Sequence, residues 1–186
     1  MRTLIVTEFI SLDGVVEAPG GEGTHPHGGW TMAYGTSEEF EYKLKETMDA
    51  ESMLLGRITY QGFAEAWPTM QDVFADKMNS MPKHVVTNTL TDLEWNATPI
   101  SGDVVAGVTE LKNGDGGPIL VHGSATLVQF LLAEHLVDEL HLMTFPVVIG
   151  GGLRMFPDDR AKLEFELVEL ARYDTGVLLQ VYRPVA

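Results

Sequence analysis

The sequence predicts an α/β domain built on a mostly parallel, mixed central sheet, with helices on both faces and a C-terminal antiparallel hairpin. Short apolar runs typical of buried strands alternate with amphipathic segments typical of helices along most of the 186 residues. The last two apolar runs, residues 165–171 and 177–182, flank Asp174-Thr175-Gly176, which is a hairpin turn signal. No linker, repeat or low-complexity segment divides the chain, so residues 1–186 are interpreted as one domain.

The first elements are a strand, a long loop and a helix. Residues 3–10 alternate in the manner of a strand, and residues 13–35 form a loop rich in Gly, Pro and His. A loop of this length inside a compact domain is usually functional or mobile. Ser37 is interpreted as the N-cap of the helix, whose apolar face is expected to contain Phe40, Leu44 and Met48.

The remaining elements follow the same alternation. They are a buried strand over 52–55, a helix from about Thr59, a helix over 71–81, a strand over 83–87, a helix capped by Asp103 and reaching Asn113, a short strand over 119–121, an amphipathic helix with Leu127, Leu131 and Leu132 on one face, and a strand over 140–149. A mostly parallel sheet covered on both faces follows from this order.

The composition excludes several classes of protein. Lys and Arg number 12 against 27 Asp and Glu, so the net charge of −15 argues against binding to nucleic acid. The absence of cysteine excludes disulfides, thiolate nucleophiles and Cys-ligated zinc. No apolar run reaches the roughly 18 residues of a membrane span, and the N-terminal apolar run is too short for a signal peptide. We therefore expect a cytoplasmic protein. No metal site is predicted, because His25 and His27 lack a matching carboxylate pattern.

Turns whose residues could bind a ligand follow three of the expected strands. Their residues are Gly56, Arg57 and Thr59 after the second strand, Thr87 and Asn88 after the third, and Gly123, Ser124, Ala125 and Thr126 after the strand over 119–121. A strand–glycine–helix turn binds phosphate, because free backbone N–H groups and the positive end of the helix dipole point at the ligand. Ligands of open α/β sheets lie across the carboxyl ends of the strands. One dinucleotide with a 2′-phosphate is therefore expected here, its pyrophosphate at 123–126 and its adenosine end at Arg57, Thr87 and Asn88.

A run of three glycines, Gly150 to Gly152, ends the strand over 140–149 and also indicates a special backbone role. Other nucleotide and hydrolase motifs are missing: the chain contains neither the G-x-G-x-x-G fingerprint near an N-terminal strand, nor a P-loop, nor a G-x-S-x-G elbow.

These residues resemble the reductase domain found at the C-terminus of the bifunctional riboflavin-biosynthesis deaminase–reductase (RibD-like), which has the three-layer dihydrofolate-reductase-like fold. The matching segments, in the family's order, are Ser11-Leu12-Asp13-Gly14, Leu55-Gly56-Arg57-Ile58-Thr59-Tyr60, Val121-His122-Gly123-Ser124, Leu136-Val137-Asp138-Glu139-Leu140 and Pro146-Val147-Val148-Ile149-Gly150-Gly151-Gly152. The resemblance implies NADPH as cofactor. It implies cofactor contacts at Gly56, Arg57, Thr59, Thr87, Asn88, Gly123, Ser124, Ala125, Thr126, Gly150, Gly151 and Gly152.

The resemblance also implies residues around the substrate. Asp13 matches the acidic position near the substrate and the nicotinamide, and it is a catalytic candidate for orienting or protonating the substrate. In dihydrofolate reductases an acid on the first helix protonates the substrate. The corresponding helix here contains Glu38, Glu39 and Glu41, and we predict Glu39 as the proton donor. Trp30 and Tyr34 are candidates for stacking on a flat ring.

We therefore expect an NADPH-dependent reductase that transfers hydride to a small heterocyclic substrate, similar to 5-amino-6-(5-phosphoribosylamino)uracil reductase. Val15 stands where the biosynthetic reductases usually carry a basic residue, which weighs against a phosphorylated ribosyl substrate. The alternatives are a dihydrofolate reductase proper and a non-catalytic nucleotide- or flavin-binding module. A homodimer is expected, because Leu140, Leu142 and residues 147–149, together with the C-terminal hairpin, are more apolar than a sheet edge can safely expose.

Overall fold

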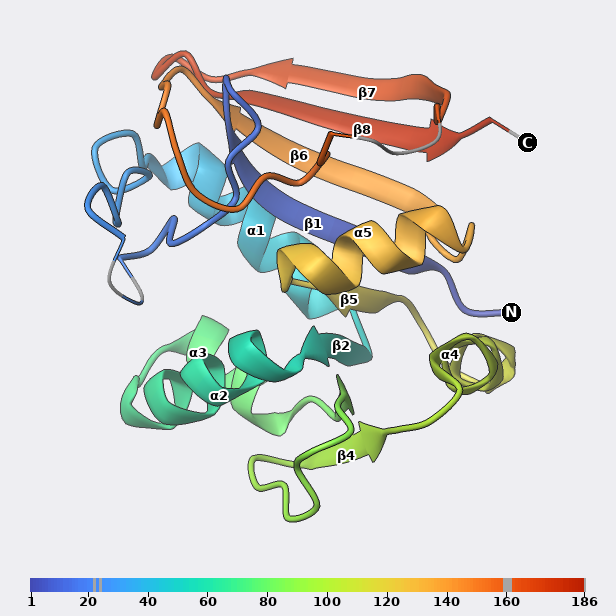
Figure 1. The fold of residues 1–186 in the computed structure, drawn as a ribbon. Coiled ribbons are helices and arrows are strands. Elements are labelled where there is room, and N and C mark those ends of the chain that lie inside the picture. Colours follow the sequence, from blue (N-terminus) through green and yellow to red (C-terminus); the bar gives the residue numbers. More distant parts are fainter. Residues whose placement is uncertain (22, 24, 159–161, 186) are drawn as a thin grey trace.

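The fold is organised around an eight-stranded sheet in the order β4-β3-β2-β5-β1-β6-β8-β7 (Figure 1). The computed structural model describes residues 1–21, 23, 25–158 and 162–185. The strands are β1 (Leu4–Ser11), β2 (Ser52–Gly56), β3 (Lys83–Val86), β4 (Ala97–Ile100), β5 (Ile119–Val121), β6 (Glu139–Phe145), β7 (Phe165–Arg172) and β8 (Leu178–Pro184). Strands β1 to β6 pair in parallel, whereas β8 pairs antiparallel with both β6 and β7. The predicted α/β fold with a C-terminal antiparallel hairpin is confirmed.

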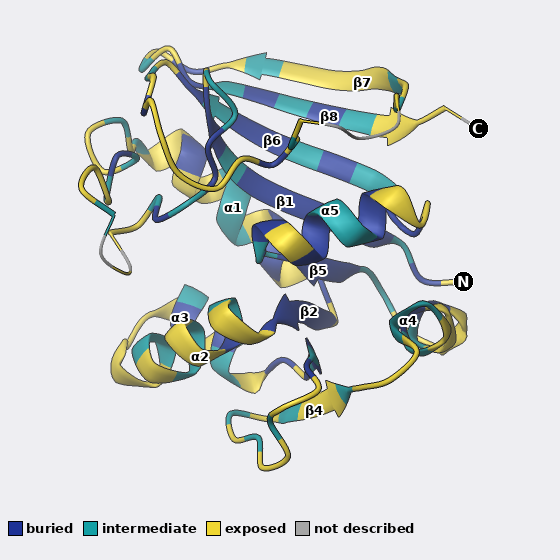
Figure 2. Ribbon diagram, in the orientation of Figure 1, coloured by how far each residue is buried: buried dark blue, intermediate teal, exposed yellow. Residues whose placement is uncertain are grey.

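Helices cover both faces of the sheet. They are α1 (Ser37–Asp49), α2 (Arg57–Ala66), α3 (Val73–Ser80), α4 (Val104–Asn113) and α5 (Ala125–Ala133), with a short 3₁₀ helix η1 (Trp67–Thr69) after α2. Strand β1 shows how the sheet divides the core, because its side chains alternate between the faces. Leu4, Val6 and Ile10 pack with α4 and α5, whereas Ile5 packs with residues of α2 and α3. Figures 1 and 2 show β1 as a buried strand with α1 and α5 on opposite sides.

The structure corrects several predicted boundaries. Strand β4 was not expected, because its sequence Ala-Thr-Pro-Ile is short and contains Pro99; proline is tolerated there since β4 is an edge strand. Strand β6 ends at Phe145 rather than Ile149, directly before Pro146. The N-cap of α1 is Thr36 rather than Ser37.

The predicted apolar face of α1 was wrong. Phe40 is 51% exposed and Met48 39% exposed, whereas the buried residues of this helix are Glu39, Glu46 and Thr47. Charged and hydroxyl groups face the sheet because β1 and β6 present Thr7 and His141 to this side, and both bind Glu46. Tertiary hydrogen bonds therefore overrode the amphipathic pattern.

The structure also changes the argument for a homodimer. Leu140 and Leu142 are buried, because β6 lies inside the sheet between β1 and β8. The exposed apolar edge is instead β7, where Leu167, Val168 and Leu170 are exposed (Figure 2). Of residues 147–149, Ile149 is buried and Val148 is 65% exposed, so the homodimer stays a prediction that rests on the edge strand and on Val148. In the described part of the chain, no helix combines the length and apolar character needed to cross a bilayer.

Candidate functional site

Two helices begin at the same groove on the carboxyl edge of the sheet. Helix α2 starts at Arg57 directly after β2, and α5 starts at Ala125 just after β5. Between them lies a groove of about 310 Å³. Its lining residues are Gly56, Arg57, Ile58, Val86, Val104, Ser124, Thr126, Leu127 and Phe130. Four predicted cofactor residues, Gly56, Arg57, Ser124 and Thr126, therefore come together.

The close approach of the two turns depends on glycine at Gly56 and Gly123. A Cβ atom on Gly56 would collide with the side chain of Ser124, and the Gly56 N–H donates to the Gly123 carbonyl at 3.2 Å. Gly123 has φ of +94°, a conformation that favours glycine, and precedes a cis peptide bond to Ser124. Thr59, one turn into α2, lies against Gly123: its Oγ1 would be 3.3 Å from a Cβ added there.

The groove suits an anionic group. The first N–H groups of an α-helix have no intrahelical partners, and the dipole adds positive potential at the same end. Arg57 is the cation among the lining residues; it is exposed and donates a hydrogen bond to Gln61 of its own helix at 3.0 Å. The hydroxyls of Ser124 and Thr126 lie 3.1 Å apart at the start of α5. The groove therefore offers donors and positive potential in a protein of net charge −15.

Thr87 and Asn88 lie beside the groove without lining it, because the lining residue of β3 is Val86. The Thr87 hydroxyl accepts the backbone N–H groups of Thr89 and Leu90 at 3.2 and 3.1 Å. Asn88 Oδ1 accepts the Gly102 N–H at 3.0 Å. Both side chains thus shape the loops next to β3.

Asp13 fastens the glycine-rich turn to the end of β1. Its carboxylate accepts the N–H groups of Ile149 at 3.0 Å and Gly150 at 2.8 Å, together with the Ser11 hydroxyl at 2.7 Å. These hydrogen bonds, that of Ile149 first, lower the pKa of Asp13 to about 2. The carboxylate is therefore ionised at neutral pH, which suits an orienting role and disfavours proton donation by Asp13.

The three glycines of the run differ in the space available for a side chain. Gly150 and Gly151 have open space where a Cβ would be, whereas a Cβ on Gly152 would lie 3.0 Å from both Glu17 and His25. His25 Nε2 lies 3.1 Å from the Gly151 carbonyl oxygen. The long loop after β1 thus packs directly on this turn.

Glu39 and Trp30 are engaged in structural contacts. The Glu39 carboxylate accepts both the N–H and the hydroxyl of Thr36, at 2.5 and 2.8 Å, and the Thr175 hydroxyl at 2.5 Å. It thereby caps α1 and ties it to the β7–β8 turn; Glu38 and Glu41 are exposed. Trp30 is buried, and its indole N–H donates to the Glu17 carbonyl at 2.9 Å. Tyr34 is half-buried, with its ring 5.8 Å from that of Phe145.

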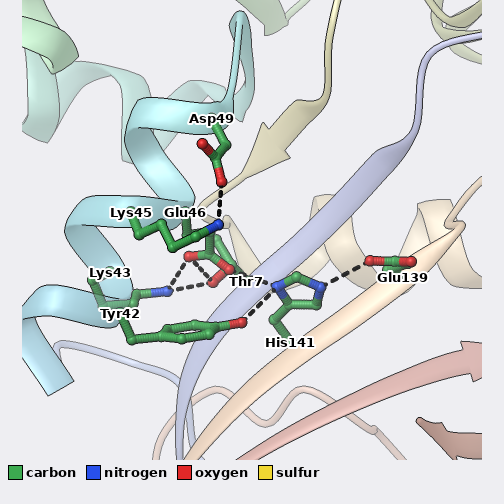
Figure 3. A network of polar contacts seen from close by, with 8 residues as sticks. All are labelled: Thr7, Tyr42, Lys43, Lys45, Glu46, Asp49, Glu139 and His141. Atoms are coloured by element: carbon green, nitrogen blue, oxygen red, sulfur yellow. Dashed lines mark hydrogen bonds and ion pairs between the residues drawn. The ribbon is translucent and has the colours of Figure 1, made fainter. Parts of the chain in front are cut away.

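A buried polar network under α1 was not predicted (Figure 3). Glu46 accepts the Lys43 ammonium at 2.7 Å, the Thr7 hydroxyl at 2.8 Å and a ring nitrogen of His141 at 2.7 Å. The second His141 nitrogen lies 3.1 Å from Glu139, which also pairs with Arg183. Burial would raise the pKa of Glu46, but Lys43 and His141 hold it well below its usual range.

This network joins α1 to β1 and β6. The Lys43 ammonium also lies 5.2 Å from the ring centre of half-buried Phe9. The available sequence signal was Thr7 and His141, polar residues in the middle of strands that are largely apolar. It did not identify the partners on α1, because they are 36 and 95 residues distant.

His122, directly after β5, is a second residue that sequence reasoning did not single out. Its Nε2 is buried without a hydrogen-bond partner among the described residues. Burial lowers the pKa of His122 to about 4, so the ring is neutral at pH 7. Its ring centre is 6.3 Å from that of Phe63 on α2.

The hydrogen bonds from the Ile149 and Gly150 N–H groups to Asp13, here called the Asp13 clamp, should depend on pH. Folding lowers the pKa of Asp13 from 3.8 to about 2. The clamp therefore stabilises the fold above about pH 3.8, and this stabilisation is lost as the pH falls toward 2. In the wild type, hydrogen-exchange protection of the Ile149 and Gly150 amides should fall over this range. In Asp13→Asn it should be low throughout, whereas Asp174→Asn, in the exposed hairpin turn, should match the wild type. Equal protection in Asp13→Asn and wild type would contradict the clamp.

Comparisons with known proteins agree with this architecture. A Bacillus subtilis (strain 168) relative, described as uncharacterized protein YyaP, is 26% identical over 97% of this chain and 94% of its own. The crystal structure of a putative riboflavin biosynthesis protein from Shewanella sp. PV-4 matches with a TM-score of 0.76 and 20% identity, covering 100% of both chains. Dihydrofolate reductase from Enterococcus faecalis, solved with NADP(H), matches with a TM-score of 0.66 and 13% identity over 99% of this chain and 97% of its own.

These structural matches show that the fold is dihydrofolate-reductase-like, as the resemblance in the sequence implied. The family model described as the RibD C-terminal domain matches residues 2–179, which is nearly the whole chain and includes the groove, the glycine turn and the polar network. The chain therefore belongs to the RibD C-terminal domain family.

Proposed function

We propose that this protein is an NADPH-dependent reductase that transfers hydride to a small heterocyclic substrate. The observation that carries the proposal is the groove in which α2 and α5 begin together, with Gly56 and Gly123 permitting close approach to the backbone. Membership of the RibD C-terminal domain family supports a reductase of the riboflavin-biosynthesis type. The fold shared with an NADP(H)-bound dihydrofolate reductase supports the cofactor class.

The groove residues fit a phosphorylated dinucleotide. The backbone from Gly123 to Thr126 would hold the pyrophosphate, because it combines a glycine turn with a helix N-terminus. Arg57 would bind the 2′-phosphate as the cation of the groove lining. The bound nicotinamide supplies hydride; the protein contributes positioning and exclusion of water.

The substrate is proposed to bind at the carboxyl end of β1, the edge of the sheet at which the groove also lies, where half-buried Phe9 and Tyr34 both pack on Phe145 and the Lys43 ammonium lies over the Phe9 ring. Glu46 holds the Lys43 ammonium at 2.7 Å, and 12% of the Lys43 side chain is exposed. Asp13 orients the glycine turn beside this region. Val15 is fully buried, so the position that is basic in the biosynthetic reductases cannot contact a phosphate. This favours a heterocycle without a phosphorylated ribosyl group.

The direct test is NADPH oxidation across a panel containing a ribosylaminopyrimidine, dihydrofolate and simple heterocyclic and carbonyl compounds. Turnover of a non-phosphorylated heterocycle is expected. Preferential turnover of dihydrofolate would instead identify a dihydrofolate reductase proper. Tight NADPH binding without turnover of any compound would identify a non-catalytic binding module.

Gly123→Val tests the cofactor groove. The added side chain would start 3.3 Å from Thr59 Oγ1 and project into the space of the turn, so NADPH binding should be abolished. Far-UV circular dichroism should stay intact. Gly176→Val is the matched control, because Gly176 also has positive φ but lies in the β7–β8 turn. Unchanged NADPH affinity of Gly123→Val, measured by calorimetry, would remove the proposed pyrophosphate site.

Arg57→Ala tests the choice of NADPH over NADH. Loss of a charged hydrogen bond to the 2′-phosphate should weaken NADPH by roughly 1.5–3 kcal/mol and NADH much less. Arg172→Ala, which removes an exposed cation from β7, should change neither affinity. If Arg57→Ala weakened NADPH and NADH binding equally, Arg57 would instead contact the pyrophosphate or have a structural role.

A further inference from the structure

The proposed reduction needs a proton as well as a hydride, and the acids predicted for this role are engaged elsewhere. Asp13 is ionised at neutral pH, because hydrogen bonds, that of the Ile149 N–H first, lower its pKa to about 2. Glu39 accepts three hydrogen bonds that fix the start of α1. Glu38 and Glu41, the other predicted acids of this helix, are exposed. The proton therefore has to come from a different group.

Lys43 carries transferable protons on the side of α1 that meets β1 (Figure 3). Its Nζ donates to the Glu46 carboxylate at 2.7 Å and to the Thr7 hydroxyl on β1. An ammonium group has three N–H donors, and the part of the chain that the structure describes supplies these two acceptors and no third. The ammonium lies 5.2 Å from the centre of the Phe9 ring, at the end of β1 where the substrate is proposed to bind. One N–H of Lys43 is therefore left for a ligand.

The Lys43 ammonium also lies close to the glycine turn of the cofactor groove. Strands β1 and β5 pair in parallel up to the preceding residues, so Thr7 on β1 is the neighbour of His122 at the end of β5. His122 directly precedes Gly123. Burial is the main cause of the lowered pKa of His122, and the positive charge of Lys43 is the next, as expected for a nearby cation. Lys43 thus lies between Phe9 and the turn that is proposed to hold the cofactor.

A continuous chain of polar contacts leads from Lys43 to the surface (Figure 3). Glu46, which binds Lys43, contacts Nδ1 of His141 at 2.7 Å, and Nε2 of His141 contacts Glu139 at 3.1 Å. The exposed fraction of the side chain rises from 5% at Glu46 through 11% at His141 to 20% at Glu139. An imidazole can take up a proton at one nitrogen and release another from its second nitrogen. The chain of contacts can therefore return a proton to Lys43 after each turnover.

We propose that Lys43 is the catalytic proton donor, whose third N–H supplies the proton that accompanies hydride transfer. This inference rests on the proposed function, since it needs a substrate bound beside the cofactor. The carbon of a substrate C=N or C=O bond accepts hydride from NADPH, and the nitrogen or oxygen of that bond takes a proton from Lys43 Nζ. The step leaves NADP⁺, the reduced substrate and a neutral Lys43 amine, which regains a proton from solvent through His141 and Glu46. The substrate class is thereby a heterocycle with a C=N or C=O bond whose heteroatom accepts a hydrogen bond from an ammonium.

Lys43→Arg tests the proposal, because arginine keeps the positive charge and the hydrogen-bond donors but does not release its proton. The measurement is single-turnover NADPH oxidation with the panel compound that the wild type reduces fastest. The rate should fall by roughly 100-fold or more, as expected for loss of a general acid. Circular dichroism and the NADPH affinity measured by calorimetry should match the wild type. Lys45→Arg is the matched control on the same helix, because Lys45 is exposed and paired with Asp49; it should keep the wild-type rate.

The outcomes separate this inference from the proposed function. A wild-type rate in Lys43→Arg, or a raised substrate KM with an unchanged single-turnover rate at saturation, would make Lys43 a binding residue; either result overturns the inference and leaves the reductase intact. A wild type that reduces no compound of the panel overturns the proposed function and this inference together. If circular dichroism shows that Lys43→Arg does not fold, Lys43→Gln is used, which keeps hydrogen-bond donors without an acidic proton. The same loss of rate is then expected, and a wild-type rate overturns the inference.

Discussion

The contact between the turn after β2 and the turn after β5 is the constraint on which the site depends. Gly56 leaves no room for a side chain because Ser124 fills the space, and the Gly56 N–H bonds to the Gly123 carbonyl. Strands β2 and β5 are neighbours in the sheet, so this contact brings the starts of α2 and α5 to one groove. A single helix N-terminus is a common feature of α/β proteins. Two of them at one groove, with Arg57 among its lining residues, provide backbone N–H donors and positive potential in the same place.

Strand β1 separates two chemically different regions. Toward α5 it presents Glu8 behind the glycine turn, and toward α1 it presents Thr7 to the Lys43–Glu46–His141 network. A buried network of this kind is stable only while every member has a partner, because removing one leaves an uncompensated charge. It also explains why α1 turns a charged face to the sheet and leaves Phe40 and Met48 exposed.

Asp13 connects these regions to the loops around them. It holds Ile149 and Gly150 at the end of β1, while Glu17 holds the Leu153 N–H at 2.7 Å on the same turn. Two carboxylates from the long loop thus fix the glycine turn by accepting its backbone N–H groups. In this acidic protein, some carboxylates therefore hold loop backbone in place. The positive potential of the groove comes from Arg57 and the helix dipoles.

The sequence by itself determined the order of strands and helices apart from β4, the hairpin, the family resemblance and four residues that line the groove. These follow from local periodicity and from glycine motifs, which depend on neighbours close along the chain. Only the tertiary structure decided which acids are already engaged. Glu39 is occupied by Thr36 and by Thr175, which is 136 residues away, and Asp13 by amides of equally distant residues. Contacts across such separations leave no periodic pattern, so the polar network under α1 and the place of Glu8 beside Gly123 became visible only when the sheet brought their strands together.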